Sequence, residues 1–312
     1  MKSTKQAIGI VIPYYNAAAQ IETVVRKAIQ YAETVVVVDD NSLERLPKSI
    51  REIEKVVILK TNSNLGVGGA TKCGFEYLLS LSQIKVIVKL DADNQMDTGY
   101  IPELVKPIFE REYDFVKGNR FRDFKALKQM PPIRRFGNLV LSFLSKGATG
   151  YWNCFDFNNG FFSIATKNLK LIEINSLSNT YFFETSLIAS LYYQHARILE
   201  VPMPAIYGNE KSNMKIFKMP FVFMGKLFKI FFERIWKAYF VYDFNIGTLY
   251  ILFGLPLFLG GVSFGGYNWY HYSSQGILTP LGTIMISAIL IILGFQLLLQ
   301  AVQFDIFKTP SN

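Results

Sequence analysis

The stretch IKVIVKLDADNQ, Ile84 to Gln95, decides the fold and is the first sign of a binding site. Its apolar run, Val86 to Leu90, is typical of a buried strand. Asp91, Asp93 and Gln95 follow at two-residue spacing, which in an extended chain puts side chains on the same side. In an open parallel sheet, ligands bind just beyond the strand ends. The alternative interpretation is a polar turn that caps the next helix.

The three oxygen-bearing side chains suit a hard divalent cation. Two carboxylates and an amide are ligand types that Mg²⁺ or Mn²⁺ prefers. The hypothesis is that Asp91, Asp93 and Gln95 hold this cation on the diphosphate of a nucleotide. The rest of the chain would then supply the nucleotide, the acceptor and contact with a membrane.

Composition bounds the class of protein. The 312 residues are enough for one large domain with additional segments, and half of them are hydrophobic. A net charge of +9 is compatible with nucleic acid, an anionic membrane surface or a phosphorylated substrate. Cys73 and Cys154 have no metal-type or redox-type spacing, so they are interpreted as reduced thiols of a cytosolic domain. The N-terminal apolar segment is too short for a signal peptide.

Residues 1–215 alternate short apolar runs with helical patterns. Strands are expected at 7–12 (ended by Pro13), 34–38, 56–59, 86–90, 115–116, 161–164 and 196–201. Helices are expected at 18–31, after a Gly/Asn loop at 62–69 and through 79, and at 137–144 and 186–193. The strands are continuously apolar rather than alternating. This pattern predicts an α/β fold with a mostly parallel, Rossmann-like sheet covered by helices on both faces.

The segment from Ile216 to Tyr242 has a different pattern, with large apolar side chains at helical spacing. Five cations are interspersed among them: Lys218, Lys226, Lys229, Arg234 and Lys237. A basic, aromatic amphipathic helix is typical of a membrane interface. The alternative, a core helix of a soluble domain, would not need five cations. The predicted domains are 1–215 (α/β domain), 216–243 (amphipathic juxtamembrane helix) and 244–312 (two-helix transmembrane region).

Two uncharged apolar stretches follow, Ile246 to Tyr267 and Leu281 to Gln303. Each is close to the roughly 20 residues that span a bilayer. The loop between them, Asn268 to Pro280, has no Lys or Arg, whereas the segment before them is basic. The positive-inside rule therefore predicts an integral membrane protein with its large domain and both termini in the cytoplasm.

Three glutamines fall on one side of the second apolar stretch, Gln296, Gln300 and Gln303. Their spacing of four and three residues is that of one helix face. Amide side chains in a membrane tend to pair helices rather than face lipid. A homo-oligomer formed through the transmembrane helices is therefore one expectation.

Three further polar motifs follow predicted strands, on the same rim as Asp91. They are Pro13-Tyr14-Tyr15-Asn16 after the first strand, Asp39-Asp40-Asn41-Ser42 after the second, and Asn64-Leu65-Gly66-Val67-Gly68-Gly69-Ala70 after the third. A Gly-rich turn alone is weak evidence for a dinucleotide fold. Here it follows the third strand rather than the first, so a metal–nucleotide site fits better.

Together these motifs resemble the family 2 glycosyltransferases, which have the GT-A fold. The match is closer to the polyprenyl-phosphate branch, typified by dolichol-phosphate mannosyltransferase and bacterial undecaprenyl-phosphate glucosyltransferases. The motifs that carry the resemblance are VIPYYN at 11–16, VVDDNS at 37–42, NLGVGGA at 64–70, DADNQ at 91–95, GNRF at 118–121, RRFGN at 134–138, DFNNGFF at 156–162 and EVPMPAIYGNEKSNMK at 200–215. They cover most of residues 7–215, and paired C-terminal membrane helices also occur in the branch.

The resemblance implies a division of roles. The divalent cation would be held by Asp91, Asp93 and Gln95. The nucleotide sugar would be lined by Pro13, Tyr15, Asn16, Asp39, Asp40, Gly66 and Asp91. The acceptor phosphate would face Arg120, Arg134, Asn138 and Lys211. Catalytic roles would fall to Asp93, Arg120 and Arg134, with Asp156, before the SGF-like turn, in a catalytic or positioning role.

The chemistry agrees with these roles. Sugar transfer from a nucleoside diphosphate needs charge stabilisation at the leaving group, which a metal supplies. An acceptor phosphate is already ionised at neutral pH, so it needs cations more than a strong base. The basic loop from 120 to 135 would supply them; its alternative interpretation is a solvated loop near an anionic membrane.

The sequence departs from the family pattern at three places. Asn16 is followed by Ala17, where the family often has Glu, and the SGF turn reads Asn159-Gly160-Phe161. Lys211 stands where an Arg is usual. The QxxRW motif of processive synthases is absent, so a single transfer is expected rather than chain elongation.

The expected function is inverting transfer of one sugar from a UDP- or GDP-linked donor to a polyprenyl phosphate at the cytoplasmic membrane face. One rival is the same chemistry on a lipid hydroxyl, for which Asp156 would have to be a true general base. Another is a membrane-anchored scaffold without activity, although a scaffold gains nothing from clustered carboxylates. Nucleic acid is not expected as a partner, because the cations cluster near a substrate loop and the membrane segments.

Overall fold

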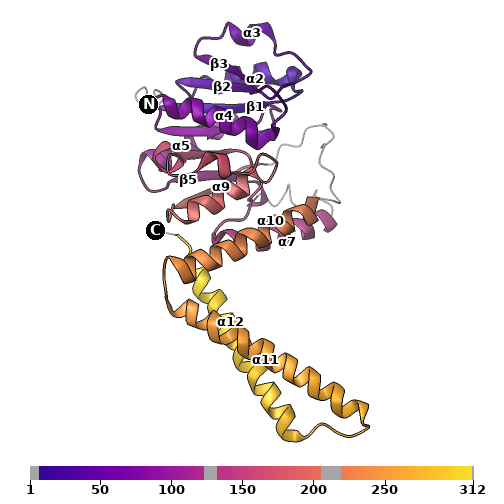
Figure 1. Cartoon of the computed structure of the whole chain (residues 1–312). Helices are drawn as coiled ribbons and strands as arrows, with labels where there is room; N and C mark the ends of the chain where they lie inside the picture. Colours follow the sequence, from indigo (N-terminus) through magenta and orange to yellow (C-terminus); the bar gives the residue numbers. More distant parts are fainter. Residues whose placement is uncertain (1–6, 123–131, 205–218, 311–312) are drawn as a thin grey trace. The chain divides into compact units, whose positions relative to one another are not determined.

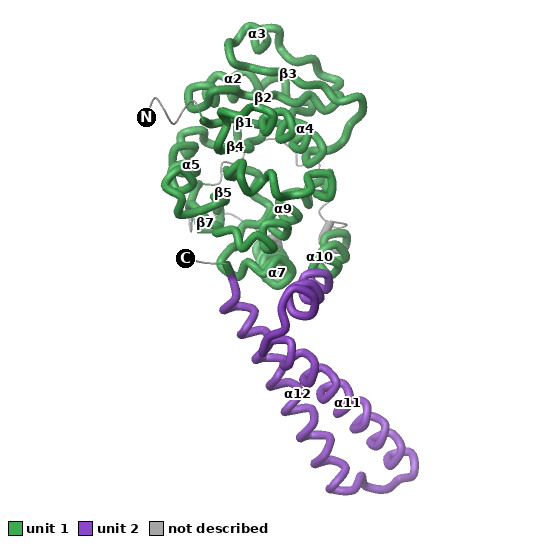
Figure 2. The backbone as a smooth tube through the Cα atoms, turned by 60° about the vertical axis from the view of Figure 1, so that its left-hand side comes forward, with its two compact units in different colours: residues 1–230, 310–312 green, residues 231–309 purple. Residues whose placement is uncertain are grey.

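The computed structural model of the chain describes residues 7–122, 132–204 and 219–310, but not the side chains of 132–134 and 219–221. The chain divides into two compact units. The first comprises residues 1–230 with 310–312, and the second residues 231–309 (Figure 2). Each unit is described by itself.

A seven-stranded sheet forms the centre of the first unit (Figure 1), in the order β3-β2-β1-β4-β6-β5-β7. The strands are β1 (Ile8–Tyr14), β2 (Thr34–Asp39), β3 (Val56–Lys60), β4 (Val86–Lys89), β5 (Phe115–Asn119), β6 (Phe162–Ala165) and β7 (Ile198–Pro202). Strand β6 runs antiparallel to β4 and β5, and the other pairings are parallel. The predicted α/β fold with a mostly parallel sheet is confirmed.

Helices cover both faces of this sheet. The helical segments that precede α10 are α2 (Ala18–Ala28), α3 (Lys48–Arg51), α4 (Gly66–Ser80), η1 (Thr98–Tyr100), α5 (Ile101–Phe109), η2 (Arg120–Arg122), α7 (Pro132–Thr149), α8 (Thr166–Leu169), η3 (Ile174–Ser176) and α9 (Phe183–Tyr192). Val35 and Val37 join the core cluster formed with α2 and α5. On the other face, Phe75 of α4 packs against Phe162 and Phe183. The valine run of β2 is therefore buried on both sides, as its continuous apolar pattern predicts.

Strand β1 continues one residue beyond Pro13, although the sequence suggested that this proline ends it. The amide of Leu90 donates to the carbonyl of Val11. The backbone N–H and C=O groups of odd-numbered β1 residues therefore point towards β4, and those of even-numbered residues point towards β2. The paired part of β4 ends at Lys89, opposite Val11. The backbone nitrogen of Pro13 points to the same side, beyond the paired part of β4. Its missing N–H therefore costs no hydrogen bond between the two strands.

Two other expectations need correction. The glycines from Gly66 to Gly69 belong to the first turn of α4 rather than to a loop. Helix α5 was not expected at all, because Pro102 and Pro107 interrupt its apolar pattern. Pro102 lies in the first turn, where a missing N–H costs nothing. Ile101, Leu104, Val105 and Ile108 of α5 are buried in the core, and Phe109 packs against it partly buried.

The second unit is built from helices (Figure 1). Its last two helices are α11 (Ile246–Ser274) and α12 (Leu281–Phe307), which lie side by side in both views. Before them come the end of α10 (Met219–Trp236), which crosses from the first unit, and the π-helical turn η4 (Lys237–Val241). Buried Arg234 of α10 holds Asp305 of α12 through two hydrogen bonds of 2.7 and 2.9 Å.

Helices α11 and α12 are long and apolar enough to cross a membrane, as the sequence predicts. The sides on which the two helices meet carry small residues, and Gly254, Gly261, Gly294 and Ala301 are buried there. The outer sides expose large apolar residues such as Phe253 and Ile292. Helix α11 also continues into the segment expected as an external loop, Asn268 to Pro280, as far as Ser274, since Tyr and Trp residues do not end a helix. It stops before Gly276, whose φ of +69° is a left-handed helix terminus.

Candidate active site

The predicted rim exists at the carboxyl ends of β1, β2 and β4. These three strands are parallel neighbours, and Tyr14 pairs with Asp39 in the register of β1 and β2. The turns after the strands therefore lie next to one another. This placement follows from topology, because parallel strands end at the same edge.

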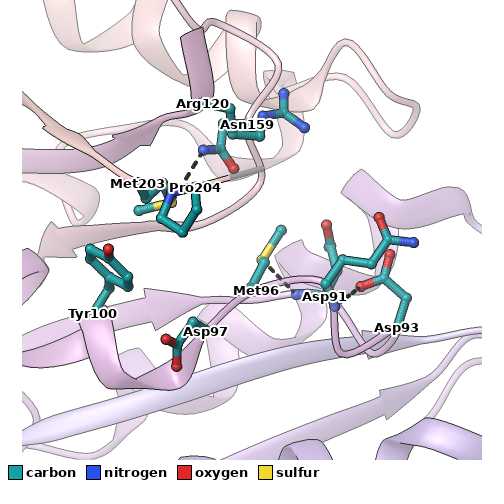
Figure 3. Close-up of a pocket in the computed structure, with 10 residues that line it drawn as sticks. Asp91, Asp93, Met96, Asp97, Tyr100, Arg120, Asn159, Met203 and Pro204 are labelled. Atoms are coloured by element: carbon teal, nitrogen blue, oxygen red, sulfur yellow. Dashed lines mark hydrogen bonds between the residues drawn. The ribbon is translucent and has the colours of Figure 1, made fainter. Parts of the chain in front are cut away.

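A pocket of about 110 Å³ opens beside the Asp91–Gln95 turn (Figure 3). One wall comes from the turn after β4 and from η1, with Asp91, Asp93 and Gln95 followed by Met96, Asp97 and Tyr100. The opposite wall comes from the other part of the sheet, with Arg120, Asn159, Met203 and Pro204. The fold thus places the acidic turn and Arg120 at one cavity.

The turn after β4 is held by its own polar atoms. The amide of Gln95 donates to Asp93 Oδ1 at 3.0 Å, and the amide of Asp91 donates to Met96 Sδ at 3.3 Å. Asn94, with a φ of +57°, makes the sharp reversal. Asparagine tolerates this left-handed conformation better than most residues. The alternative of a simple helix cap does not describe this turn, because Asp97 is the residue that caps η1, accepting from Gly99 at 2.9 Å.

A buried lysine lies beneath the acidic turn. Lys89 Nζ donates to Asp91 Oδ1 at 2.6 Å and to Glu184 Oε1 of α9 at 3.1 Å. Its side chain is 1% exposed, so the two carboxylates must compensate for its desolvation. Burial alone would lower the pKa of Lys89, but Asp91 and Glu184 outweigh burial and raise it. Lys89 is therefore a cation that fixes the orientation of Asp91.

Gly160 explains the SGF-like turn in physical terms. A Cβ at this position would lie 2.3 Å from Lys89 Nζ and 2.9 Å from Asp91 Oδ2. The turn therefore passes directly over the Lys89–Asp91 ion pair, and a side chain there would displace it. The motif DFNNGFF is tied to DADNQ by this contact.

Arg120 is paired with Asp156 in a bidentate arrangement. Its Nε and Nη2 donate to the two carboxylate oxygens at 2.8 and 2.9 Å, and its backbone amide donates at 3.1 Å. Asp156 is 1% exposed, whereas the Arg120 side chain is 40% exposed. Burial would raise the pKa of Asp156, but the charge and hydrogen bonds of Arg120 hold it below its ordinary value. Asp156 is thus an ionised carboxylate engaged with Arg120.

Two buried polar groups fix the segment that carries Asp156. Glu200 Oε1 accepts from the amides of Phe155 and Asp156 at 2.8 and 3.0 Å, and Glu200 Oε2 accepts from Asn119 Nδ2 at 2.5 Å. Lys117 Nζ donates to the carbonyl of Asp156. Both Lys117 and Glu200 are buried. The Arg120–Asp156 pair therefore has a rigid support, built from β5 and β7.

Asn16 joins two loops at the predicted nucleotide end of the rim. Its Oδ1 accepts from the Ser42 hydroxyl at 2.8 Å and from the amide of Leu43 at 3.1 Å. Asp39 Oδ1 accepts from the amide of Ser42 at 2.9 Å. Tyr15 stays 47% exposed beside them. Pro13 lies within β1, so it shapes the strand end.

Asp40 and the glycines of α4 form a packed corner. Asp40 is buried, and its two oxygens accept from the amides of Leu65 and Gly66, each at 2.8 Å. The amides of Gly68 and Gly69 donate to the carbonyl of Asn179. Gly66 has a φ of +83°, and a Cβ there would lie 2.6 Å from the same carbonyl. The backbone amides at the start of α4 therefore donate to acceptors within the protein.

Of the three other residues expected at the acceptor phosphate, only Asn138 is fully described. The side chain of Arg134 and the whole of Lys211 lie outside the described residues. Asn138 lies on α7 and is half-buried. Helix α7 also exposes an apolar face, formed by Phe136, Leu139, Val140 and Phe143.

The donor set is compatible with a divalent cation that shares its ligands with a substrate. In the part of the chain that the structure describes, no three His, Cys, Asp or Glu side chains form a metal cluster by themselves. Asp91 and Asp93 with Gln95 offer two carboxylates and one amide at the pocket. Mg²⁺ in nucleotide sites is bound in this way, by one or two carboxylates plus substrate phosphates. The residues fit the ion on this count.

Several residues of the site were not singled out as site residues from the sequence. Lys89 and Glu184 form a buried pair beneath the acidic turn. The others line the pocket: Met96, Asp97, Tyr100, Asn159, Met203 and Pro204. A lysine in the middle of an apolar strand was a usable signal for Lys89, because a buried charge needs a partner. Its partner Glu184 lies on a distant helix, which the sequence pattern does not reveal.

The model of Glycosyl transferase family 2 matches residues 9–172 of the chain. The chain belongs to this family. The match includes both β4 with its acidic turn and the Asp156 segment. It ends before α10, α11 and α12, so the membrane-type helices lie outside it.

Curated relatives agree with this assignment. An uncharacterized protein of Methanocaldococcus jannaschii is 30% identical over 204 residues, 65% of this chain and 83% of that protein. The UDP-N-acetylglucosamine–dolichyl-phosphate N-acetylglucosaminyltransferase of Methanococcus voltae is 28% identical over 217 residues, 64% of this chain and 86% of that protein. The resemblance to family 2, including its polyprenyl-phosphate branch, is confirmed.

Solved structures confirm the GT-A-like fold. Glucosyl-3-phosphoglycerate synthase from Mycobacterium tuberculosis, in complex with Mn²⁺, UDP and glucosyl-3-phosphoglycerate, has a TM-score of 0.54 at 17% identity, covering 72% of this chain and 80% of that chain. Mannosyl-3-phosphoglycerate synthase from Rubrobacter xylanophilus has a TM-score of 0.56 at 12% identity, covering 77% of each chain. These likenesses concern the fold, and the family match over residues 9–172 is what makes the protein a glycosyltransferase.

Proposed function

We propose that the protein transfers one sugar from a UDP- or GDP-linked donor to a polyprenyl phosphate, with inversion, at the cytoplasmic face of a membrane. The observation that carries this proposal is the pocket that opposes the DADNQ turn to Arg120. In the reaction, an oxygen of the acceptor phosphate forms a bond to the anomeric carbon while the bond to the donor diphosphate breaks. The nucleoside diphosphate leaves.

The donor end of the proposed site is the acidic turn. Asp91, Asp93 and Gln95 would hold Mg²⁺ or Mn²⁺, which would stabilise the charge of the departing diphosphate. Lys89 keeps one carboxylate oxygen of Asp91 engaged and so restricts its rotation. Asp39, Asn16 and exposed Tyr15 would line the nucleotide.

Asp40 and Gly66 stabilise the start of α4 beside the proposed nucleotide site. Their hydrogen bond, together with that of Leu65 to Asp40, fixes the corner at which α4 begins. The carboxylate of Asp40 is already occupied and buried. We therefore assign Asp40 to holding the nucleotide pocket in shape rather than to direct contact with the base.

The acceptor end is the Arg120 wall. Two anionic groups, the donor diphosphate and the acceptor phosphate, must approach each other, and cations offset their repulsion. Arg120 is held by Asp156 and retains a 40% exposed side chain from which it can bind phosphate oxygen. Arg134, Asn138 and Lys211 complete the proposed acceptor set. Asp156 has a positioning role in this proposal, because an ionised acceptor phosphate needs no general base.

The membrane part of the proposal rests on three helices. Helices α11 and α12 would span the bilayer, since their exposed apolar surface is unfavourable in water. Helix α10 exposes Val222, Phe228, Phe232 and Trp236 and would lie at the interface. The relative from Methanococcus voltae is named for a dolichyl-phosphate acceptor, which supports a lipid phosphate here.

The deciding experiment offers purified protein a panel of sugar nucleotides with Mg²⁺ or Mn²⁺. The acceptors are undecaprenyl phosphate, dolichyl phosphate and diacylglycerol in proteoliposomes. We expect product on a polyprenyl phosphate, and a loss of roughly 10²-fold or more in rate for Asp93→Ala. Glu54→Ala, at an exposed site of the same domain, should retain full rate.

Three results would contradict parts of the proposal. Product on diacylglycerol alone would favour transfer to a hydroxyl. Full activity of Asp93→Ala would remove the metal assignment. No transfer or hydrolysis of any sugar nucleotide, with metal and lipid present, would favour a scaffold.

A further inference from the structure

The three glutamines of α12 do not face α11. The contact side of α12 is marked by buried Ser287, Gly294, Ala301 and Asp305. Successive helix residues are rotated by about 100°. Gln296, Gln300 and Gln303 therefore lie about 180–240° from Gly294, on the opposite side of the helix. All three are exposed.

These glutamines carry amides that need partners. None of the three side chains hydrogen-bonds to another residue in the described part of the chain, residues 7–122, 132–204 and 219–310. If α12 spans a bilayer, as the proposed function has it, Gln296 and Gln300 lie within its apolar thickness. An amide facing hydrocarbon is unfavourable, so it tends to find another helix.

The same face continues as an apolar stripe with alternating spacing of four and three residues. Its members are Met285, Ile289, Ile292, Gln296, Leu299, Gln303 and Ile306, and all are exposed. A repeat of this kind presents one seam to a partner helix in left-handed packing. A single polar residue in such a seam sets the register and the number of helices.

We propose that this face, defined by the seven stripe residues and Gln300, binds a second copy of the same chain. An uncharged amide is both donor and acceptor, so a glutamine is its own complement. Two copies inserted with the same orientation bring Gln296 to the same depth as its counterpart, and likewise Gln303. A partner helix with a charged side chain would find no opposite charge on this face, so its charge would be buried without compensation. A purely apolar partner helix would leave the glutamine amides without hydrogen-bond partners.

The first test is disulfide cross-linking in proteoliposomes. The background is Cys73→Ser, since the remaining Cys154 is buried. Gln296→Cys is compared with Phe295→Cys, a matched control at nearly the same depth but rotated by about 100°. We expect covalent dimer from Gln296→Cys and little from Phe295→Cys. Equal cross-linking at both positions, or none at Gln296, would overturn the proposal.

The second test measures association by energy transfer between labelled copies at varied protein-to-lipid ratio. The variant Gln296→Leu/Gln300→Leu/Gln303→Leu remains helical and apolar, so it should still insert. We expect its association constant to fall on the order of ten-fold, since membrane hydrogen bonds contribute modestly each. Unchanged association would show that another face or another partner is used.

The two proposals fail separately. Carbonate extraction of membranes reports whether α11 and α12 are inserted at all, and release of the wild-type chain would refute the membrane assignment. An inserted, catalytically active protein that stays monomeric at high density would refute only the dimer. Transfer activity is expected in the triple leucine variant, because the glutamines lie outside the described pocket.

Discussion

At the scale of single residues, the site depends on two buried ion pairs with different purposes. Lys89 links Asp91 of the acidic turn to Glu184, and Arg120 links Asp156 to the pocket. In each pair a fully buried group orients a partly exposed one. A charged side chain held in this way can meet a substrate without first losing its freedom of rotation.

The Asp156 pair makes a prediction about pH. The folded-state pKa of Asp156 is lowered, so its stabilising effect is present above the ordinary Asp value of about 4 and is lost as pH falls through the folded value. The stability advantage of wild type over Asp156→Asn, followed by thermal unfolding, should therefore shrink below about pH 4.

The same variant separates positioning from base catalysis. With Arg120 loosened, Asp156→Asn should lose at least roughly ten-fold in kcat/KM for the acceptor. The shape of its pH–rate profile between pH 5 and 8 should remain that of wild type. A general base would show otherwise, because removing it would abolish an ionisation from the profile.

Lys89 makes a prediction about stability. Lys89→Met leaves buried Glu184 without its counter-charge and should cost about 3–5 kcal/mol. The double variant Lys89→Met/Glu184→Gln should cost less than the sum of the single variants, since no charge remains buried alone. Thermal unfolding of wild type, Lys89→Met, Glu184→Gln and the double variant gives the four stabilities of this double-mutant cycle. Lys85→Met, at an exposed position, is the control and should change little.

A site-specific readout accompanies that cycle. The double variant should bind the nucleoside diphosphate with Mn²⁺ more weakly than wild type, because Asp91 has lost its anchor. Additive losses of stability, together with unchanged nucleotide affinity, would contradict the role assigned to Lys89.

At the scale of elements, α7 carries an exposed apolar face outside the two membrane-type helices. Phe136, Leu139, Val140 and Phe143 recur at the spacing of one helix face, and Phe136 and Phe143 are 69% and 63% exposed. A soluble domain rarely leaves such a stripe open. The stripe is consistent with contact with the bilayer surface, where the proposed lipid acceptor would lie.

This surface can be tested without disturbing the core. Phe136→Glu/Phe143→Glu should reduce transfer to undecaprenyl phosphate in liposomes by roughly five-fold or more, through loss of interfacial apolar contact. Transfer to a short, water-soluble prenyl phosphate should stay near the wild-type rate. Leu171→Glu, at a 73% exposed apolar residue of the same domain, should affect neither. Equal losses with both acceptors would indicate damage to the site itself.

At the scale of the whole molecule, the charge pattern sets the expected orientation in the membrane. The helices before α11 carry Lys226, Lys229, Arg234 and Lys237, and the chain from Gln275 to Pro280 carries no cation. By the positive-inside rule, this pattern supports the proposed topology, with the sheet domain in the cytoplasm and the α11–α12 turn outside.

Labelling with a membrane-impermeant thiol reagent checks this orientation. In the Cys73→Ser background, Gln275→Cys should react in right-side-out vesicles, and Glu54→Cys should react only after the vesicles are opened. Both positions are exposed in the structure, so accessibility within the protein does not limit the reaction. The reverse pattern would invert the proposed topology.

Much of the fold was determined by the sequence alone. Continuous valine runs predicted buried parallel strands, and uncharged stretches of the required length predicted the two apolar helices. Local chemistry was enough for these elements, because burial on both faces and length are written in the pattern itself. The set of polar strand ends likewise predicted one rim, since parallel strands end at the same edge.

Tertiary structure alone decided which groups meet. Glu184 pairs with Lys89, which is 95 residues away in the sequence, and Asp156 pairs with Arg120, which is 36 residues away. The amides of the Gly-rich turn were taken by Asn179, and the glutamines of α12 were turned away from α11. Partners distant in sequence depend on packing, and a one-dimensional pattern specifies a residue's face but not what lies opposite it.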